Sequence, residues 1–299
     1  MEVKQKLHLS IVPSYQCNYH CSYCYLGKLT NDKTLLDLNI LKDRINELEK
    51  NYDIEHICLY GGEISLLDKK YINDMLYILG NKNIALVTNL SNDWIIDYAL
   101  IHNIKLCVSL NKERPYYNET LDKLKKLKGI KNIKLSVVVL PSLINGDITS
   151  TFNEYKELGF NILFIQYHPS EYSKIKYDIG NNNFIEFVLK MCDENKKQGY
   201  PIDIDNEIIF NDDTYSPTMN NFVFISPNGK YSSVIYEKNI EKQIFFDTIE
   251  EWETHCKNEY KEYYSKCNMC QLFNKCKAEH LIDMGNKNDC SGFYNYFIK

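Results

Sequence analysis

Three cysteines near the start of the sequence carry its strongest chemical signal. Cys17, Cys21 and Cys24 form a C-x3-C-x2-C pattern that directly follows an apolar segment, residues 7–12. Cysteine thiolates are the usual ligands of iron–sulfur clusters. Three thiolates on one short loop can hold three irons of a four-iron cluster, and the fourth iron then has no protein ligand nearby. The spacing therefore indicates a cluster that binds and reduces a small molecule at its open iron.

A second motif, Gly61-Gly62-Glu63, follows the next apolar segment, residues 55–60. In folds that alternate strands and helices, functional side chains gather where parallel strands end. Glycines let a ligand approach the backbone closely, and a carboxylate can bind an ammonium group. The glycine pair alone is equally typical of a plain turn, so its meaning depends on the elements around it.

Those elements alternate over the first two thirds of the sequence. Nearly continuous apolar segments predict buried strands, and segments with helical periodicity between them predict covering helices. Six such units imply an α/β fold with a parallel sheet, which either closes as a partial barrel or stays open. We predict strands at residues 7–12, 55–60, 84–88, 105–110, 134–140 and 161–167, and helices at residues 35–50, 69–79, 93–102, 117–128, 148–158 and 183–198.

The alternation stops near Tyr200, and we place a domain boundary at residue 205. Residues 1–205 then form the core domain, and residues 206–299 form a smaller, cysteine-rich domain. In the smaller domain, the Pro-Asn-Gly turn that ends at Gly229 predicts a hairpin over residues 222–231. A further helix is expected around residues 248–255.

Composition excludes some classes of protein. The chain has 299 residues, a net charge of −5 and two arginines, Arg44 and Arg114. Nucleic-acid surfaces usually need a basic face, so we expect no nucleic-acid partner. No apolar segment approaches the ~20 residues of a membrane span, and the first residues lack the apolar core of a signal peptide. We expect a cytoplasmic protein without a membrane partner, in which Cys58 and Cys107 are core thiols and the clustered cysteines bind metal.

The cysteine loop, with Tyr23 before its last cysteine, and the Gly-Gly-Glu motif together closely resemble those of the radical S-adenosylmethionine (radical SAM) enzymes. The resemblance covers residues 5–170 and implies a partial (β/α)6 TIM barrel. It also implies that the three cysteines, the catalytic centre, ligate a [4Fe–4S] cluster whose open iron is chelated by S-adenosylmethionine (AdoMet). The cofactor-binding residues that it implies are Tyr23, Gly61, Gly62, Glu63, Thr88, Asn89, Ser109 and Asn145.

A second set of cysteines lies in the tail, at Cys267, Cys270, Cys276 and Cys290. Four thiolates complete the coordination of a [4Fe–4S] cluster, so such a cluster carries electrons but has no open iron. The tail resembles the SPASM extension of radical enzymes that modify peptides, except that His280 and Ser233 replace two of its cysteines. Both positions belong to the inner auxiliary cluster of that extension. The resemblance therefore implies that one auxiliary [4Fe–4S] cluster, the outer one, is kept.

Zinc is the alternative metal at both cysteine sets. At the first set, His20 would complete a Cys3His site, although the adjacent His20 and Cys21 have difficulty converging on one ion. At the tail, His280 or Cys290 would be the fourth ligand of a closed site. On this hypothesis the chain is a non-catalytic zinc protein.

The radical SAM resemblance also implies a reaction and its partners. A reduced cluster cleaves AdoMet to methionine and a 5′-deoxyadenosyl radical, which removes a hydrogen atom from a substrate. SPASM-type tails imply a peptide or protein substrate that is matured by a crosslink, a thioether or an epimerisation, as in ribosomally made peptides. A small metabolite is the alternative substrate. The implied partners are an electron donor such as flavodoxin or ferredoxin and a separate peptide-recognition protein.

Overall fold

The computed structural model describes residues 4–206, 222–232 and 243–267, of which residues 181, 259, 260 and 262–267 are described by their backbone only. In these residues eight strands form one sheet in the order β6-β5-β4-β3-β2-β1-β7-β8. β1 to β6 are parallel and follow one another in chain order. The strands are β1 (Gln5–Ile11), β2 (Tyr52–Leu59), β3 (Asn83–Thr88), β4 (Lys105–Ser109), β5 (Ile133–Val139), β6 (Asn161–Gln166), β7 (Phe222–Ile225) and β8 (Tyr231–Ser232).

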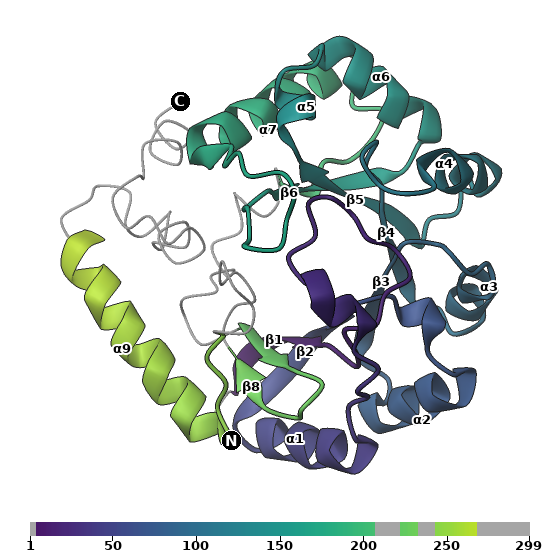
Figure 1. Ribbon diagram of the computed structural model, residues 1–299. Coiled ribbons are helices and arrows are strands. Elements are labelled where there is room, and N and C mark those ends of the chain that lie inside the picture. The colour runs from purple at the N-terminus through teal and green to yellow at the C-terminus, as the bar shows by residue number, and fades with distance from the viewer. Residues whose placement is uncertain (1–3, 207–221, 233–242, 268–299) are drawn as a thin grey trace.

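Helices connect the parallel strands and cover their outer face. In Figure 1, the helices from α1 to α7 form an arc around the curved sheet. The α/β fold is therefore a partial TIM barrel, and the six predicted strands are confirmed. The helices are α1 (Leu38–Asn51), α2 (Lys69–Leu79), α3 (Trp94–Ile101), α4 (Tyr117–Lys126), α5 (Pro141–Ile144), α6 (Ile148–Leu158), α7 (Gly180–Lys197) and α9 (Ile249–Cys267).

Burial fixes the register of the strands. Leu7, Leu9 and Ile11 alternate along β1 and are each at most 1% exposed. They belong to one hydrophobic cluster with the inner faces of the helices, including Leu41 and Leu48 of α1. A slip of one residue would turn the three β1 side chains away from the helices. The burial pattern therefore determines where β1 ends and where the loop with the three cysteines begins.

Aspartates determine where several helices begin. The Asp37 carboxylate accepts hydrogen bonds from the Asn39 and Ile40 N–H groups at the start of α1, at 2.7 and 3.3 Å. Asp68 caps α2 in the same way, and Asp147 caps α6. Because such caps stabilise a helix by about 1 kcal/mol, α1 begins three residues later than its apolar periodicity predicts.

The predicted hairpin is confirmed, but its place in the sheet was not foreseen. β7 and β8 are antiparallel, and the Gly229 N–H donates to the Ser226 carbonyl at 2.8 Å in the turn. β7 also pairs in parallel with β1, from His8 opposite Phe222 onward. The hairpin thus extends the core sheet beyond β1. The proposed domain boundary at residue 205 stays a prediction.

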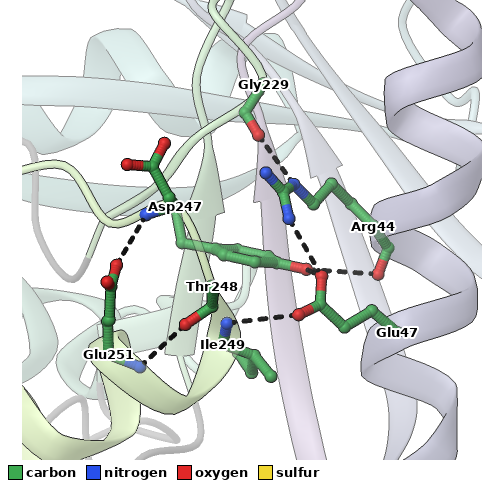
Figure 2. A network of polar contacts seen from close by, with 8 residues as sticks. Arg44, Glu47, Gly229, Asp247, Thr248, Ile249 and Glu251 are labelled. Atoms are coloured by element: carbon green, nitrogen blue, oxygen red, sulfur yellow. Dashed lines mark hydrogen bonds and ion pairs between the residues drawn. The ribbon is translucent and has the colours of Figure 1, made fainter.

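A polar network, which we call the α1 latch, joins the hairpin and α9 to α1 (Figure 2). It consists of Arg44, Glu47, Gly229, Tyr231 and Ile249. The Arg44 Nε donates to the Gly229 carbonyl at 2.8 Å, and its Nη1 lies 3.0 Å from Glu47. The Tyr231 hydroxyl and the Ile249 N–H both donate to the Glu47 carboxylate, at 2.8 and 3.3 Å. One carboxylate thereby ties three segments of the chain together.

The described helices also bear on the membrane question. None of them combines the length and the apolar character that crossing a bilayer requires.

Candidate functional site

The cysteine loop, residues 12–37 between β1 and α1, brings the three predicted ligands together. All three are free thiols that are partly exposed. The Cys17 N–H donates to the Thr30 carbonyl at 2.9 Å, and the Cys24 N–H donates to the Cys21 carbonyl at 3.1 Å. In Figure 1 this loop, drawn in purple, lies inside the arc of helices. The thiols therefore stand on the concave side of the partial barrel.

The pKa values of the thiols indicate that the three groups lie near one another in a partly desolvated site. Burial is the main reason that the pKa of Cys17 rises to about 11. The Tyr19 N–H, 3.4 Å from the Cys17 sulfur, opposes this increase. Negative charge on the neighbouring groups adds to it, namely on Glu63, Cys24 and Cys21. Burial also raises the pKa of Cys21 and of Cys24. The three sulfurs are thus close enough to interact electrostatically.

The spacing of the thiols bears on the choice between a cluster and a single zinc ion. A tetrahedral zinc with Zn–S bonds of about 2.3 Å holds its sulfurs about 3.8 Å apart. Within the described ranges, no three His, Cys, Asp or Glu side chains are grouped closely enough to hold one metal ion. His20 is exposed, and its Nδ1 lies 3.4 Å from the Thr30 hydroxyl. The described residues therefore show no preformed site for a single ion.

The two motif glycines are required by the cysteine loop itself. The Gly62 N–H donates to the Ser14 carbonyl at 3.0 Å, and the Glu63 N–H donates to the Gln16 carbonyl at 2.7 Å. A Cβ atom at Gly62 would lie 1.9 Å from the Gln16 carbonyl oxygen. At Gly61, whose φ is +141°, it would lie 2.6 Å from that of Ser14. From sequence we expected a ligand to approach this backbone, whereas here the close approach is made by the loop that carries the cysteines.

The Glu63 carboxylate joins the ends of β2 and β3. It is 2% exposed and accepts three hydrogen bonds, from the Thr88 hydroxyl at 2.6 Å, the Asn89 N–H at 2.6 Å and the Ser65 N–H at 3.0 Å. The Asn89 side-chain amide donates to the Asn18 Oδ1 at 3.1 Å, and its nitrogen lies 4.0 Å from the Cys17 sulfur. The predicted residues Glu63, Thr88 and Asn89 therefore meet beside the first cysteine.

Tyr23 connects the cysteine loop to the end of β4. Its hydroxyl donates to the Asn111 Oδ1 at 3.3 Å. Asn111 is itself fixed to β5, because its amide donates to the Val138 carbonyl at 2.6 Å and its Oδ1 accepts from the Val138 N–H at 3.2 Å. No sequence motif indicates Asn111. Its place two residues after Ser109, at a strand end, is the signal that could have found it.

Arg114 is the second residue that the motifs do not indicate. Its N–H donates to the Asn111 carbonyl at 3.1 Å, and its Cζ lies 5.9 Å from the centre of the Tyr19 ring. Its charge also interacts with the Tyr23 hydroxyl. Desolvation lowers the pKa of Arg114, but nearby negative groups outweigh this and raise it, namely Tyr23, Cys21, Glu63 and Cys17. A positive charge therefore faces the thiols.

The last two predicted cofactor-binding residues lie at the end of β4 and after α5. Ser109 ends β4, is partly buried and pairs in register with Ser136 of β5. Asn145 follows α5 and is exposed, and its N–H donates to the Pro141 carbonyl at 3.0 Å. A role for either residue in binding the cofactor stays a prediction.

Apolar and backbone contacts hold the cysteine loop on two sides. On the β7 side, Phe224 packs with Val12 and Leu26, and Cys24 lies against this cluster. On the β6 side, the Lys174 N–H donates to the Ser22 carbonyl at 2.6 Å. The loop is therefore clamped between the hairpin and the segment that follows β6, which reduces the access of water to Cys24.

Six of the eight remaining cysteines fall into two groups. Burial raises the pKa of Cys58 to about 12 and also raises that of Cys107, as expected of unreactive core thiols. The side chain of Cys267 and the residues Cys270, Cys276 and Cys290 lie outside the described residues, as does the expected SPASM-like arrangement. The auxiliary cluster stays a prediction.

Comparisons with known proteins assign the family. Residues 11–216 match the Radical SAM superfamily. This match covers more than half of the chain, so the protein belongs to that superfamily.

Individual relatives add detail. "Putative peptide biosynthesis protein YydG" of Bacillus subtilis (strain 168) is 25% identical over 128 residues, which are 41% of this chain and 40% of that protein. The fold is similar to that of anSMEcpe with bound AdoMet, at 17% identity and a TM-score of 0.71 over 98% of this chain and 96% of that one. It is also similar to Streptococcus suis SuiB bound to precursor peptide SuiA, at 16% identity and a TM-score of 0.60 over 78% of this chain and 60% of that one. At these identities the two structures establish the fold alone.

Membership of the superfamily implies a [4Fe–4S] cluster and AdoMet, and the residues of the site fit both. The three thiols lie close enough to one another to interact electrostatically. Glu63 uses three of the roughly four lone-pair positions of a carboxylate for protein donors, which leaves one for an ammonium group.

Proposed function

We propose that the protein reductively cleaves AdoMet and uses the resulting 5′-deoxyadenosyl radical to modify a peptide or protein. The observation that carries this proposal is the convergence of three thiols and one buried carboxylate, Glu63, on the concave side of the partial barrel. Thiolates bind the irons of a cluster, and a carboxylate binds an ammonium group. The thiols therefore suit the cluster, and the carboxylate suits the ammonium group of AdoMet.

Each residue has a distinct task in this proposal. Cys17, Cys21 and Cys24 hold the cluster as thiolates. Glu63 accepts a hydrogen bond from the methionine ammonium with its remaining lone pair. Thr88 and Asn89 fix the Glu63 carboxylate by their hydrogen bonds, so it meets the ammonium without first reorganising.

The chain also protects the reaction from solvent. When bound, the cluster and AdoMet supply reductive bond cleavage and a radical that abstracts a hydrogen atom from carbon. The apolar residues Val12, Leu26 and Phe224 pack beside Cys24, and the segment after β6 covers Ser22. By excluding water, these contacts protect a reactive intermediate from side reactions.

A peptide is the substrate class that we propose. The SuiB structure contains a precursor peptide, and the name of YydG refers to peptide biosynthesis. The match to YydG spans 40% of that protein and the match to SuiB spans 60% of that chain, so these names support a substrate class and no particular reaction. We propose a ribosomally made precursor peptide, reduction by flavodoxin or ferredoxin, and recruitment by a separate recognition protein.

Anaerobic reconstitution tests the proposed function. With one cluster on the loop and one in the tail, we expect about eight irons per chain and about four in Cys270→Ala. Reduction with dithionite in the presence of AdoMet should release 5′-deoxyadenosine from both proteins. A colourless protein that contains zinc and no iron would refute the proposal.

The peptide part of the proposal has its own test. A short peptide with Cys, Tyr or Trp, encoded beside this gene, is expressed together with the enzyme and examined by mass spectrometry. A crosslink or thioether appears as the loss of two hydrogens, and an epimerisation as uptake of deuterium from heavy water. If every such peptide is unchanged while 5′-deoxyadenosine still forms, the substrate is of another class, with a small metabolite as the first alternative.

A further inference from the structure

Arg114 places a permanent positive charge beside the three thiols. Arginine stays protonated at any working pH, and the charge of this one interacts with Cys17 and Cys21. Its Cζ lies 5.9 Å from the centre of the Tyr19 ring, and the Tyr19 N–H lies 3.4 Å from the Cys17 sulfur. A charge at this place affects whatever the thiols bind.

Arg114 is not neutralised by an ion pair within the part of the chain that the structure describes. There, no Asp or Glu lies within ion-pair distance of its guanidinium, in contrast to Arg44, which pairs with Glu47 at 3.0 Å. The Glu63 carboxylate interacts with Arg114 through space, but its hydrogen bonds come from other residues. Arg114 is partly buried, and buried charges normally have an anionic partner. The site is therefore suited to an anion that it takes up later.

The guanidinium is held in a fixed place. Its Cζ lies 5.9 Å from the centre of the Tyr19 ring, within the range of a cation–π contact. The Arg114 N–H donates to the Asn111 carbonyl at 3.1 Å, and the Asn111 Oδ1 accepts from the Tyr23 hydroxyl at 3.3 Å. Tyr19 and Tyr23 belong to the cysteine loop, so the guanidinium contacts the same loop that carries the thiols. A fixed charge acts on bound groups without a cost of reorganisation.

The cluster that three thiolates hold is the anion that these observations favour. A [4Fe–4S] core with three thiolates is negative overall, and each added electron makes it more negative. Net charge is one of the factors that set the potential of such clusters. A nearby positive charge stabilises the reduced form more than the oxidised form, because the Coulomb attraction grows with the charge.

We propose that Arg114 is the fixed counter-charge of the cluster on Cys17, Cys21 and Cys24, and that it raises the reduction potential of this cluster so that an electron donor can reduce it. The proposal rests on the proposed function, because it requires that cluster. Arg114 acts on the cluster through its charge and takes no part in the bond cleavage itself.

A redox titration of the AdoMet-free holoprotein tests the proposal. The potential is read from the electron paramagnetic resonance signal that is missing in Cys24→Ala, and therefore belongs to the first cluster. In Arg114→Gln, the ratio of reduced to oxidised cluster at a fixed potential should fall about tenfold, which corresponds to about 59 mV for a one-electron couple. Arg114→Lys keeps the charge, so the reduction potential of its first cluster should stay close to that of the wild type.

Lys112→Gln is the matched control. It removes one positive charge from the same segment, but this lysine is exposed and pairs with Glu154 at 2.8 Å. The reduction potential of the first cluster should be unchanged in this variant. If Lys112→Gln shifts the potential as much as Arg114→Gln, overall charge is responsible and the proposal is wrong.

The other outcomes are also decisive. An unchanged potential in Arg114→Gln with weaker AdoMet binding would mean that the guanidinium binds the AdoMet carboxylate, and would overturn the proposal. Arg114→Met, which keeps the aliphatic packing on Tyr19, replaces Gln if the Gln variant loads no iron. If neither variant loads iron, Arg114 serves cluster assembly and the proposal fails. A wild type without any cluster would instead refute the proposed function.

Discussion

Arg44 and Arg114, the two arginines of the chain, have opposite surroundings. Arg44 pairs with Glu47, donates to the Gly229 carbonyl and joins the hairpin to α1. Arg114 faces thiols that are neutral until they bind metal. The difference separates two uses of one side chain: a charge that is matched within the protein holds segments together, and a charge that faces deprotonatable ligands prepares a site for an anionic group.

Glu47 and Glu63 show the same contrast with the opposite sign. Glu47 is about a quarter exposed and its partners include the cation Arg44. Glu63 is 2% exposed, and its three hydrogen bonds come from neutral donors. Neutral donors stabilise the carboxylate without cancelling its charge. These partners leave the Glu63 carboxylate able to accept a hydrogen bond from an ammonium group.

The largest effect is expected from removing a thiol of the cysteine loop. In Cys24→Ala, only two thiols remain, so the first cluster should not assemble and 5′-deoxyadenosine formation should fall to background. Iron analysis and chromatography measure both quantities. Cys107→Ala is the control, because that thiol is buried in β4. Equal loss of activity in the two variants would contradict the assignment of the loop.

A Cβ atom at Gly62 should displace the cysteine loop. In Gly62→Ala the new atom would stand 1.9 Å from the Gln16 carbonyl oxygen, so the loop must move and iron loading should drop strongly. Gly80→Ala is the control: a Cβ there meets nothing within 4 Å. Its φ of +66° and ψ of −153° strain an alanine, so the variant should lose about 1–3 kcal/mol of stability but load iron normally. Normal loading in Gly62→Ala would show that the close approach does not position the thiols.

Neutralising Glu63 should weaken AdoMet binding. A hydrogen bond to a charged group contributes about 1.5–3 kcal/mol, so Glu63→Gln should raise the AdoMet dissociation constant about ten- to a hundredfold. Equilibrium binding to the reconstituted protein measures this change, with iron content checked in parallel. Glu47→Gln, the same substitution in the α1 latch, should leave the constant unchanged. A similar loss in both variants would remove the distinction between the two carboxylates.

The smallest effect is a pH-dependent loss of stability in Glu47→Gln. Burial raises the pKa of Glu47, but hydrogen bonds from Tyr231, Arg44 and the Ile249 N–H outweigh it and leave the pKa below its ordinary value of 4.5. Because the pKa is lower in the folded state, the charged carboxylate stabilises the fold above that pH and loses this effect as the pH falls through the folded-state pKa.

Thermal unfolding at a series of pH values measures this loss. The variant should be less stable than the wild type by about 1 kcal/mol at neutral pH, a modest value because the group is partly exposed. The difference should shrink below pH 4.5. A constant difference at every pH would mean that the Glu47 charge does not contribute.

Local patterns predicted much of this arrangement. Apolar segments located six strands, and the strand ends located Glu63, Thr88 and Asn89 beside the thiols. Long-range pairing was not predictable, because nothing within residues 222–225 specifies that β7 pairs with β1. The same limit hid Asn111 and the role of Arg114, which depend on contacts with Tyr23 across the barrel. The close approach at Gly62 also requires two segments that are distant in sequence.

The most direct test of the central claim is electron paramagnetic resonance of the dithionite-reduced protein with and without AdoMet. If Cys17, Cys21 and Cys24 hold a cluster with an open iron, adding AdoMet should change the signal of that cluster. The change should be absent from a variant with alanine at all three positions. A wild-type signal that does not respond to AdoMet, or the same response in the triple variant, would contradict the account.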